Sequence, residues 1–101
     1  MEIFSGKVDG SLDVNAPYQL NGMVAGDLNA LSGAEITLNG MVVGDLIVLK
    51  GAFVSINGMV NGAVIARGGD VEIYGHCARL IIEDDSSNVT VSPDAFIGGE
   101  R

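Results

Sequence analysis

The sequence is poor in the residues that most often build catalytic centres, metal sites and covalent cross-links. It holds one cysteine and one histidine, which excludes an internal disulfide framework and any cysteine-rich zinc site. Only five basic residues stand against 13 acidic ones, giving a formal net charge of −8. Because phosphate recognition needs a basic surface, we expect no binding to nucleic acid or anionic lipid.

Long hydrophobic runs are also missing. No uncharged stretch reaches the ~18 apolar residues that span a bilayer, and the first seven residues lack a signal-peptide layout. We therefore expect a soluble, cytoplasmic protein without direct membrane insertion. Tryptophan is absent and aromatic residues make up 5% of the chain, yet 48% of it is hydrophobic. Such a core must be built from small, branched side chains.

Glycine, in contrast, is abundant: the chain has 15, against ~7 expected for this length. Most of them belong to an internal repeat, in which residues 20–28 recur at 38–46 and again at 56–64. The repeat predicts a single domain, 1–101, with coils 4–19, 20–37, 38–55, 56–72 and 73–90 and a closing segment 91–101. Coil 56–72 lacks one residue, and we place this deletion between Val64 and Arg67.

Apolar residues recur every six positions, as Val24, Ala30, Ile36, Val42, Val48, Val54, Val60 and Ala66. A helix of 3.6 residues per turn does not keep one face at that spacing, whereas short strands broken by regular corners do. A step of 18 residues therefore predicts three short strands per coil, each stacked on its counterpart one coil away. The predicted fold class is an all-β, single-domain β-solenoid, a triangular β-helix of about five coils.

Stacking of equivalent positions predicts four core columns, because a coil alone cannot bury its apolar residues. They are Phe4, Leu20, Leu38, Ile56, Ile73 and Val91; Val8, Val24, Val42, Val60, Cys77 and Ala95; Leu12, Leu28, Leu46, Val64 and Ile81; and Ile36, Val54, Val71 and Val89. The terminal coils then present apolar rings and unpaired strand edges unless something caps them. Segments 15–18 and 92–94 each contain a proline, which lacks a ladder donor, and are candidate partial caps.

Two motifs recur in the repeat. Gly22–Leu28 and Gly40–Leu46 carry Gly-x-Val-x-Gly-Asp-Leu, and Gly51–Gly58 carries Gly-Ala-x-Val-x-Ile-x-Gly. These motifs resemble the repeat of the bactofilins, the bacterial polymer-forming cytoskeletal proteins. The resemblance covers roughly residues 4–91. It implies a right-handed triangular β-helix that associates end to end into filaments without nucleotide.

The six-residue spacing also resembles the left-handed β-helix of hexapeptide acyltransferases and gamma-class carbonic anhydrases. Periodicity alone does not choose the hand. Those enzymes depend on histidine, and this chain has only His76. We therefore expect a protein that is not an enzyme, with no catalytic residue, no cofactor and no bound metal.

One predicted column on the outer surface consists of Lys7, Met23, Met41, Met59 and His76, beside a ladder of Asn21, Asn39 and Asn57. Methionine is adaptable and recurs at binding surfaces, so the three methionines are candidate contact residues. The alternative is that the column points inward or is covered by the termini. The asparagines are predicted to be structural. Cys77 follows His76 in a strand and therefore points to the opposite face, into the core.

The middle coil is unusually apolar on its outer side. Val43, Ile47 and Phe53 stand where coil 20–37 has Ala25, Asn29 and Glu35. Together with Met41 they predict a contiguous outward flank for self-association or for a partner. The alternative is that Phe53 folds over a corner and shields its own glycines.

Acidic residues gather toward the C-terminus, where Glu83–Asn88 departs from the repeat. This segment predicts a solvated acidic edge, because the fixed ligand spacing of a calcium loop is missing. Asp27 and Asp45 follow glycine at the same corner, which predicts turn chemistry.

The preferred function is a non-enzymatic, self-associating scaffold, bactofilin-like, that forms homo-oligomers or filaments. It would assemble through its terminal coils, 4–19 and 73–101, and laterally through the apolar flank. The alternative is an acidic binding or inhibitory protein, an immunity protein or antitoxin that neutralises a basic partner, or a mimic of nucleic-acid charge. Electrostatic steering would favour such a basic partner.

Overall fold

The computed structural model describes residues 2–84 and 86–98, apart from the side chains of Glu2 and Phe96. This part of the chain forms strands and turns and contains no helix, so the predicted all-β class is confirmed. The strands are β1 (Glu2–Phe4), β2 (Lys7–Val8), β3 (Leu12–Val14), β4 (Pro17–Leu20), β5 (Met23–Val24), β6 (Leu28–Ala30), β7 (Glu35–Leu38), β8 (Met41–Val42), β9 (Leu46–Leu49), β10 (Phe53–Ile56), β11 (Met59–Arg67), β12 (Asp70–Ile73), β13 (His76–Ile82), β14 (Asn88–Val91) and β15 (Phe96–Ile97).

The strands form three faces, and each strand pairs in parallel with its counterpart in the next coil. The first face contains β2, β5, β8, the start of β11, the start of β13, and β15. The second face contains β3, β6, β9, the end of β11 and the end of β13. The third face contains β1, β4, β7, β10, β12 and β14. The predicted β-solenoid of about five coils is therefore confirmed.

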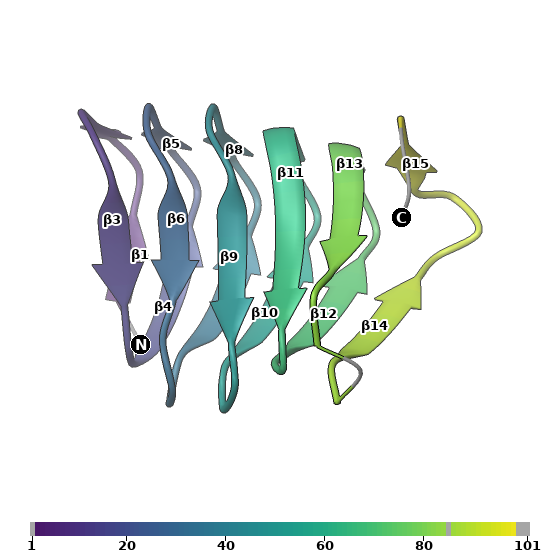
Figure 1. Cartoon of the computed structure of the whole chain (residues 1–101). Helices are drawn as coiled ribbons and strands as arrows, with labels where there is room; N and C mark the ends of the chain where they lie inside the picture. The colour runs from purple at the N-terminus through teal and green to yellow at the C-terminus, as the bar shows by residue number, and fades with distance from the viewer. Residues whose placement is uncertain (1, 85, 99–101) are drawn as a thin grey trace.

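Figure 1 shows the coils side by side, from the N-terminal coil at the left to the C-terminal coil at the right. The strands of the second face, at the front of the view, run downward while the chain advances to the right. This is the sense of a right-handed helix. The same hand is found in nearly all crossover connections between parallel strands.

The core follows the six-residue period. None of the eight residues from Val24 to Ala66 in that series is more than 1% exposed. Equivalent residues stack in register: Val42, for example, lies between Val24 and Val60. Tyr18, which the predicted columns omit, stacks on Ile36 and is buried.

One member of the third predicted column is wrong. Leu80, and not Ile81, stacks on Val64 and is buried. The register of β11 and β13 shifts between Val60 and Ala63, because β13 spans this corner with one residue fewer. A change of one residue turns every following side chain to the other side of the sheet, so Ile81 lies on the outer surface.

The second predicted column is also wrong at its last position. Ile97 pairs with Cys77, whereas Ala95 lies at the edge of the core. The turn at Ser92, where the Ala95 N–H donates to the Ser92 carbonyl over 3.0 Å, lengthens this last coil. Apolar spacing cannot locate such an insertion, because both Ala95 and Ile97 contact the core.

The deletion in coil 56–72 lies at a different corner from the predicted one. Arg67 pairs with Leu49, and Asp70 pairs with Phe53. The missing residue therefore lies between Arg67 and Asp70, not between Val64 and Arg67. The turn absorbs it, since Gly68 has a φ of 95° that favours glycine.

Of the two proline segments, residues 15–18 lie at the N-terminal end. Pro17 is the first residue of β4 and pairs with Glu35 of β7, and together with Asn15, Ala16 and Tyr18 it lines the hollow at this end, so partial capping there stays a prediction. A strand's first residue is a position where the missing N–H of proline is tolerated. The second segment joins β14 to β15 and swings outward (Figure 1). Within residues 2–84 and 86–98, no strand covers either end of the solenoid.

Candidate assembly surfaces

The N-terminal end presents an apolar ring. Phe4, Val8 and Leu12 are half-buried, although the residues that stack on them in coil 20–37 are all 0% exposed. Together with Val14 and Tyr18 they line a shallow hollow at this end. Strands β1, β2 and β3 each have a neighbour on one side only. Their outer edges are therefore open to another strand.

The C-terminal end is open in the same way. Val91 is 40% exposed and Ile82 is 42% exposed, while Ile73 and Ala66, on which they stack, are both 0% exposed. No described strand lies beyond β14, β15 or the second half of β13. Residues 99–101 of the predicted closing segment lie outside the described residues.

The methionine column lies in register on the first face. Met23, Met41 and Met59 stack between Lys7 and His76. Met59 is 40% exposed and the other two methionines are half-buried, so the column points outward and the inward alternative is wrong. Its role in binding stays a prediction.

The asparagine ladder is structural, as predicted. The Asn39 side-chain amide donates to Oδ1 of Asn21 over 3.0 Å, and the Asn57 amide donates to Oδ1 of Asn39 over 3.2 Å. Coils 20–37, 38–55 and 56–72 are thereby tied together along this corner.

The two repeated aspartates also stabilise a corner. Asp27 Oδ1 accepts a hydrogen bond from the Asp45 backbone N–H over 2.8 Å, and Asp45 Oδ1 accepts one from the Ala63 N–H over 2.8 Å. These bonds run between coils and not within one turn, which differs from the predicted turn chemistry. They bind successive coils together where the backbone leaves the first face.

The predicted apolar flank of the middle coil does not form one patch. Met41 and Val43 lie together at the first face, where Val43 is 39% exposed. Ile47 lies on the second face, on β9, and Phe53 on the third, on β10. Phe53 is half-buried and lines a shallow groove beside Gly51, which is itself exposed, so the alternative that Phe53 shields the glycines of its corner is not supported.

A different apolar row lies on the second face. Ile47, Ile65 and Ile81 stack in register on its outer side, and we name them the isoleucine row. Ile65 was not among the predicted contact residues, and Ile81 was placed in the core. The alternation of the strand could have indicated that Ile65 points outward, because its neighbours Val64 and Ala66 are both buried.

His76 and Cys77 do not form a reactive pair. His76 is exposed on the first face, while Cys77 is 2% exposed within the core. Burial raises the pKa of the Cys77 thiol, which disfavours the reactive thiolate. The pair therefore lies on opposite sides of β13, as predicted.

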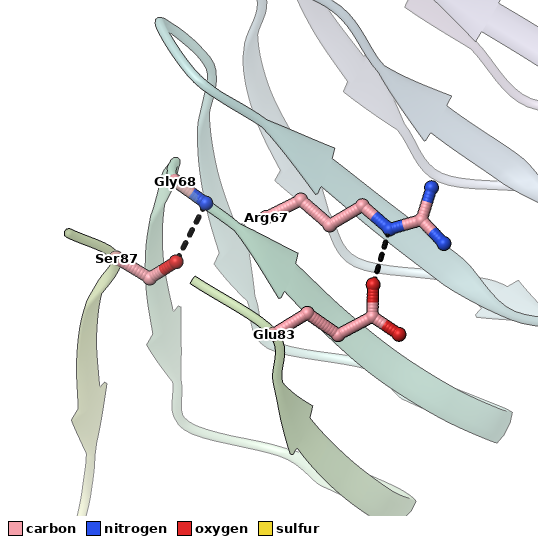
Figure 2. A network of polar contacts seen from close by, with 4 residues as sticks. All are labelled: Arg67, Gly68, Glu83 and Ser87. Atoms are coloured by element: carbon pink, nitrogen blue, oxygen red, sulfur yellow. Dashed lines mark hydrogen bonds and ion pairs between the residues drawn. The ribbon is translucent and has the colours of Figure 1, made fainter. Parts of the chain in front are cut away.

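The acidic segment is held by local contacts, part of which Figure 2 shows. Glu83 forms an ion pair with Arg67, and Ser87 Oγ accepts a hydrogen bond from the Gly68 N–H over 2.6 Å. The Ser86 N–H and hydroxyl both donate to Asp84 Oδ1, which lowers the pKa of Asp84. Within residues 2–84 and 86–98, no three His, Cys, Asp or Glu side chains converge on a possible metal site. Asp85, the third acid of this segment, lies outside the described residues.

With this geometry in view, the chain was compared with protein families, curated proteins and solved structures. None of the three comparisons found a match. The described residues include no helix that is long and apolar enough to cross a membrane. The open ends and the outer apolar rows are therefore the features from which function can be argued.

Proposed function

We propose that this chain is a non-enzymatic structural protein that assembles end to end through its terminal coils, in the manner of the bactofilins that its repeat resembles. The observation that carries this proposal is the exposure of core columns at both ends. Val91 and Ile82 are 40% and 42% exposed at positions where interior coils reach 0%. Such apolar surface is stabilised when another coil covers it.

Strand pairing supports the same proposal. Three edge strands at each end have backbone N–H and C=O groups that face away from the stack. Unprotected edges of parallel sheets favour pairing with another chain. A second copy at either end would continue the hydrogen-bond ladders and cover the apolar ring at once.

A charge placed at one end tests the proposal. In Val91→Lys the ammonium lies where the next copy would dock, and we expect filaments or large oligomers to be lost. Thr90→Lys is the matched control, since Thr90 is the exposed neighbour on the outer side of β14. Negative-stain microscopy and light scattering would measure assembly. Equal assembly by both variants would contradict the proposal.

A second candidate is an acidic binding protein that recognises a basic partner. It is favoured by the third face, where Phe53 stacks between Glu35 and Asp70. An aromatic ring between carboxylates suits a basic side chain with an apolar stem.

Ionic strength distinguishes the two candidates. Salt screens the repulsion between copies that each carry a charge of −8, so end-to-end assembly should increase with salt. Attraction to a basic partner should decrease with salt instead. Light scattering across a salt series measures the first effect, and binding of a basic peptide across the same series measures the second.

A further inference from the structure

The outer row of the second face changes its chemistry along the stack. In the first two coils it is polar: the Asn29 amide donates to Asp13 Oδ1 over 2.7 Å. In the next three coils it becomes the isoleucine row, Ile47, Ile65 and Ile81. The half-buried Leu49 lies two residues after Ile47 on the same side of β9.

The fold itself does not require apolar residues at these positions. The equivalent row on the third face contains Gln19, Thr37, Ser55, Glu72 and Thr90 in the same parallel register. Both faces bury their inner side chains equally well. The three isoleucines are half-buried, so the row adds apolar surface that the monomer leaves partly in contact with water.

Charge is balanced around the isoleucine row, whereas Asp13 and Asp27 leave the first two coils of this face acidic. Arg79 and Asp45 lie at one side of the row, and Arg67 and Glu83 at the other. Arg67 is neutralised by Glu83, whereas Arg79 forms no ion pair with any residue that the structure describes. Because the chain carries a charge of −8, the balanced part of the face is where two copies can approach with little repulsion.

We propose that the second face binds a second copy of this chain, with the two isoleucine rows packed against each other in antiparallel orientation. Side chains on this face repeat at the ~4.8 Å spacing of paired strands. A second copy presents the same spacing, so all three isoleucines of each row find partners. Packed sheets of this kind interdigitate their facing side chains.

The antiparallel orientation follows from the charges. A two-fold axis through Ile65 places Ile47 of one copy opposite Ile81 of the other. The same rotation brings Asp45 of one copy toward Arg79 of the other, and it does so twice. This contact supplies a carboxylate to Arg79, which forms no ion pair among residues 2–84 and 86–98.

The contact is small. The molecule measures 31 × 25 × 21 Å, so one lateral face offers roughly 600 Å², and the two-fold axis at Ile65 overlaps only the last three of its coils, about 350 Å² per copy. This area lies in the range of weak interfaces, so we expect a dimer that forms at high protein concentration. This interface is independent of the ends, so a dimer and a filament can form separately or together.

The test removes end-to-end assembly first. In the Val91→Lys background we expect a particle of about twice the 10.4 kDa chain mass by sedimentation equilibrium. Adding Ile65→Lys places two ammonium groups together at the two-fold axis and should raise the dimer Kd at least 100-fold. The control is Ser55→Lys, a half-buried outward residue on the third face, which should leave the dimer intact.

The outcomes separate this inference from the proposed function. A monomeric Val91→Lys protein overturns the lateral dimer and leaves end-to-end assembly standing. A wild-type protein that is only dimeric, and becomes monomeric with Ile65→Lys, supports the lateral dimer and contradicts end-to-end assembly. Loss of the dimer in Ser55→Lys as well as in Ile65→Lys overturns the inference.

Orientation has its own test in two double variants. In Ile47→Lys/Ile81→Glu, antiparallel packing places an introduced ammonium opposite an introduced carboxylate, twice per dimer. In Ile47→Lys/Ile81→Lys, the same sites carry like charges, although the net negative charge of the chain is smaller, −6 instead of −8. We expect at least tenfold tighter dimerisation of the first variant. Tighter dimerisation of the second would show that net charge governs association and would overturn the antiparallel arrangement.

Discussion

The strongest prediction concerns a column of glycines that leaves no room for a side chain. A Cβ built on Gly40 overlaps the carbonyl oxygen of Gly22 in the preceding coil. That oxygen also accepts a hydrogen bond from the Met41 N–H over 3.0 Å, and the Gly40 N–H donates a hydrogen bond to the Leu20 carbonyl oxygen over 3.0 Å. Gly40→Ala must push two coils apart at a point where both of these bonds hold them together.

The cost of this substitution can be worked out from these contacts. Weakening two backbone hydrogen bonds costs about 1–3 kcal/mol, and overpacking in a tight interior costs about 1–3 kcal/mol more. We expect a loss of about 3 kcal/mol, which lowers the Tm by about 12–24 °C for a domain of this size. The variant should still fold, because small domains have about 5–15 kcal/mol of stability.

Gly6→Ala is the matched control. Gly6 occupies the same position in the first coil, where no earlier coil lies beneath it, and its Cβ would meet only the Phe4 ring at 3.2 Å. The Phe4 ring at the end of the stack can move. The free energy of unfolding should therefore change by no more than about 0.5 kcal/mol, as at surface sites, and the Tm should shift only slightly. Thermal unfolding by circular dichroism measures both variants. Equal shifts in Tm would refute the close approach of coils as the reason for the glycine column.

Three further predictions follow from single contacts. Asp45→Ala leaves the Ala63 N–H without its acceptor and should cost about 1–3 kcal/mol in urea unfolding. Burial raises the pKa of the Cys77 thiol, so as the pH rises above about 8.5 this thiol ionises in the unfolded chain before it does in the folded protein. The free energy of unfolding should therefore fall above that pH, and thiol reagents should label only unfolded protein. Because hydrogen bonds from Ser86 lower the pKa of Asp84, the Tm advantage of wild type over Asp84→Ala should be present above about pH 4 and disappear as the pH falls below it.

Much of the core could be predicted because its signal is local and periodic. The residues at six-residue intervals from Val24 to Ala66 are buried as expected. Alternation along each strand, together with regular corners, fixes whether a side chain points to the inner or the outer side of the sheet. The prediction failed where a coil changed length. At the corner after Cys77 one residue fewer is present, and Leu80 took the core position that the repeat assigned to Ile81.

The candidate surfaces were harder to predict. Alternation correctly assigned Met41, Val43 and Ile47 to the outer side, but it could not show that a corner separates the first two from Ile47. Contiguity on a solenoid depends on which face a residue occupies and on its register with the next coil. Ile47 therefore lies beside Ile65 in the folded protein, although 18 positions separate them in the chain.

The division of this protein into stacked coils can be read from the amino-acid sequence, because an 18-residue step with glycine at fixed places and aliphatic residues every six positions is compatible with few other backbones. The hand of the coils and the neighbours of each side chain emerge in the folded protein, since one residue lost or gained at a corner reverses the side that each following residue takes. The exposure of Val91 and Ile82 also emerges there, because their burial depends on whether another coil lies above them.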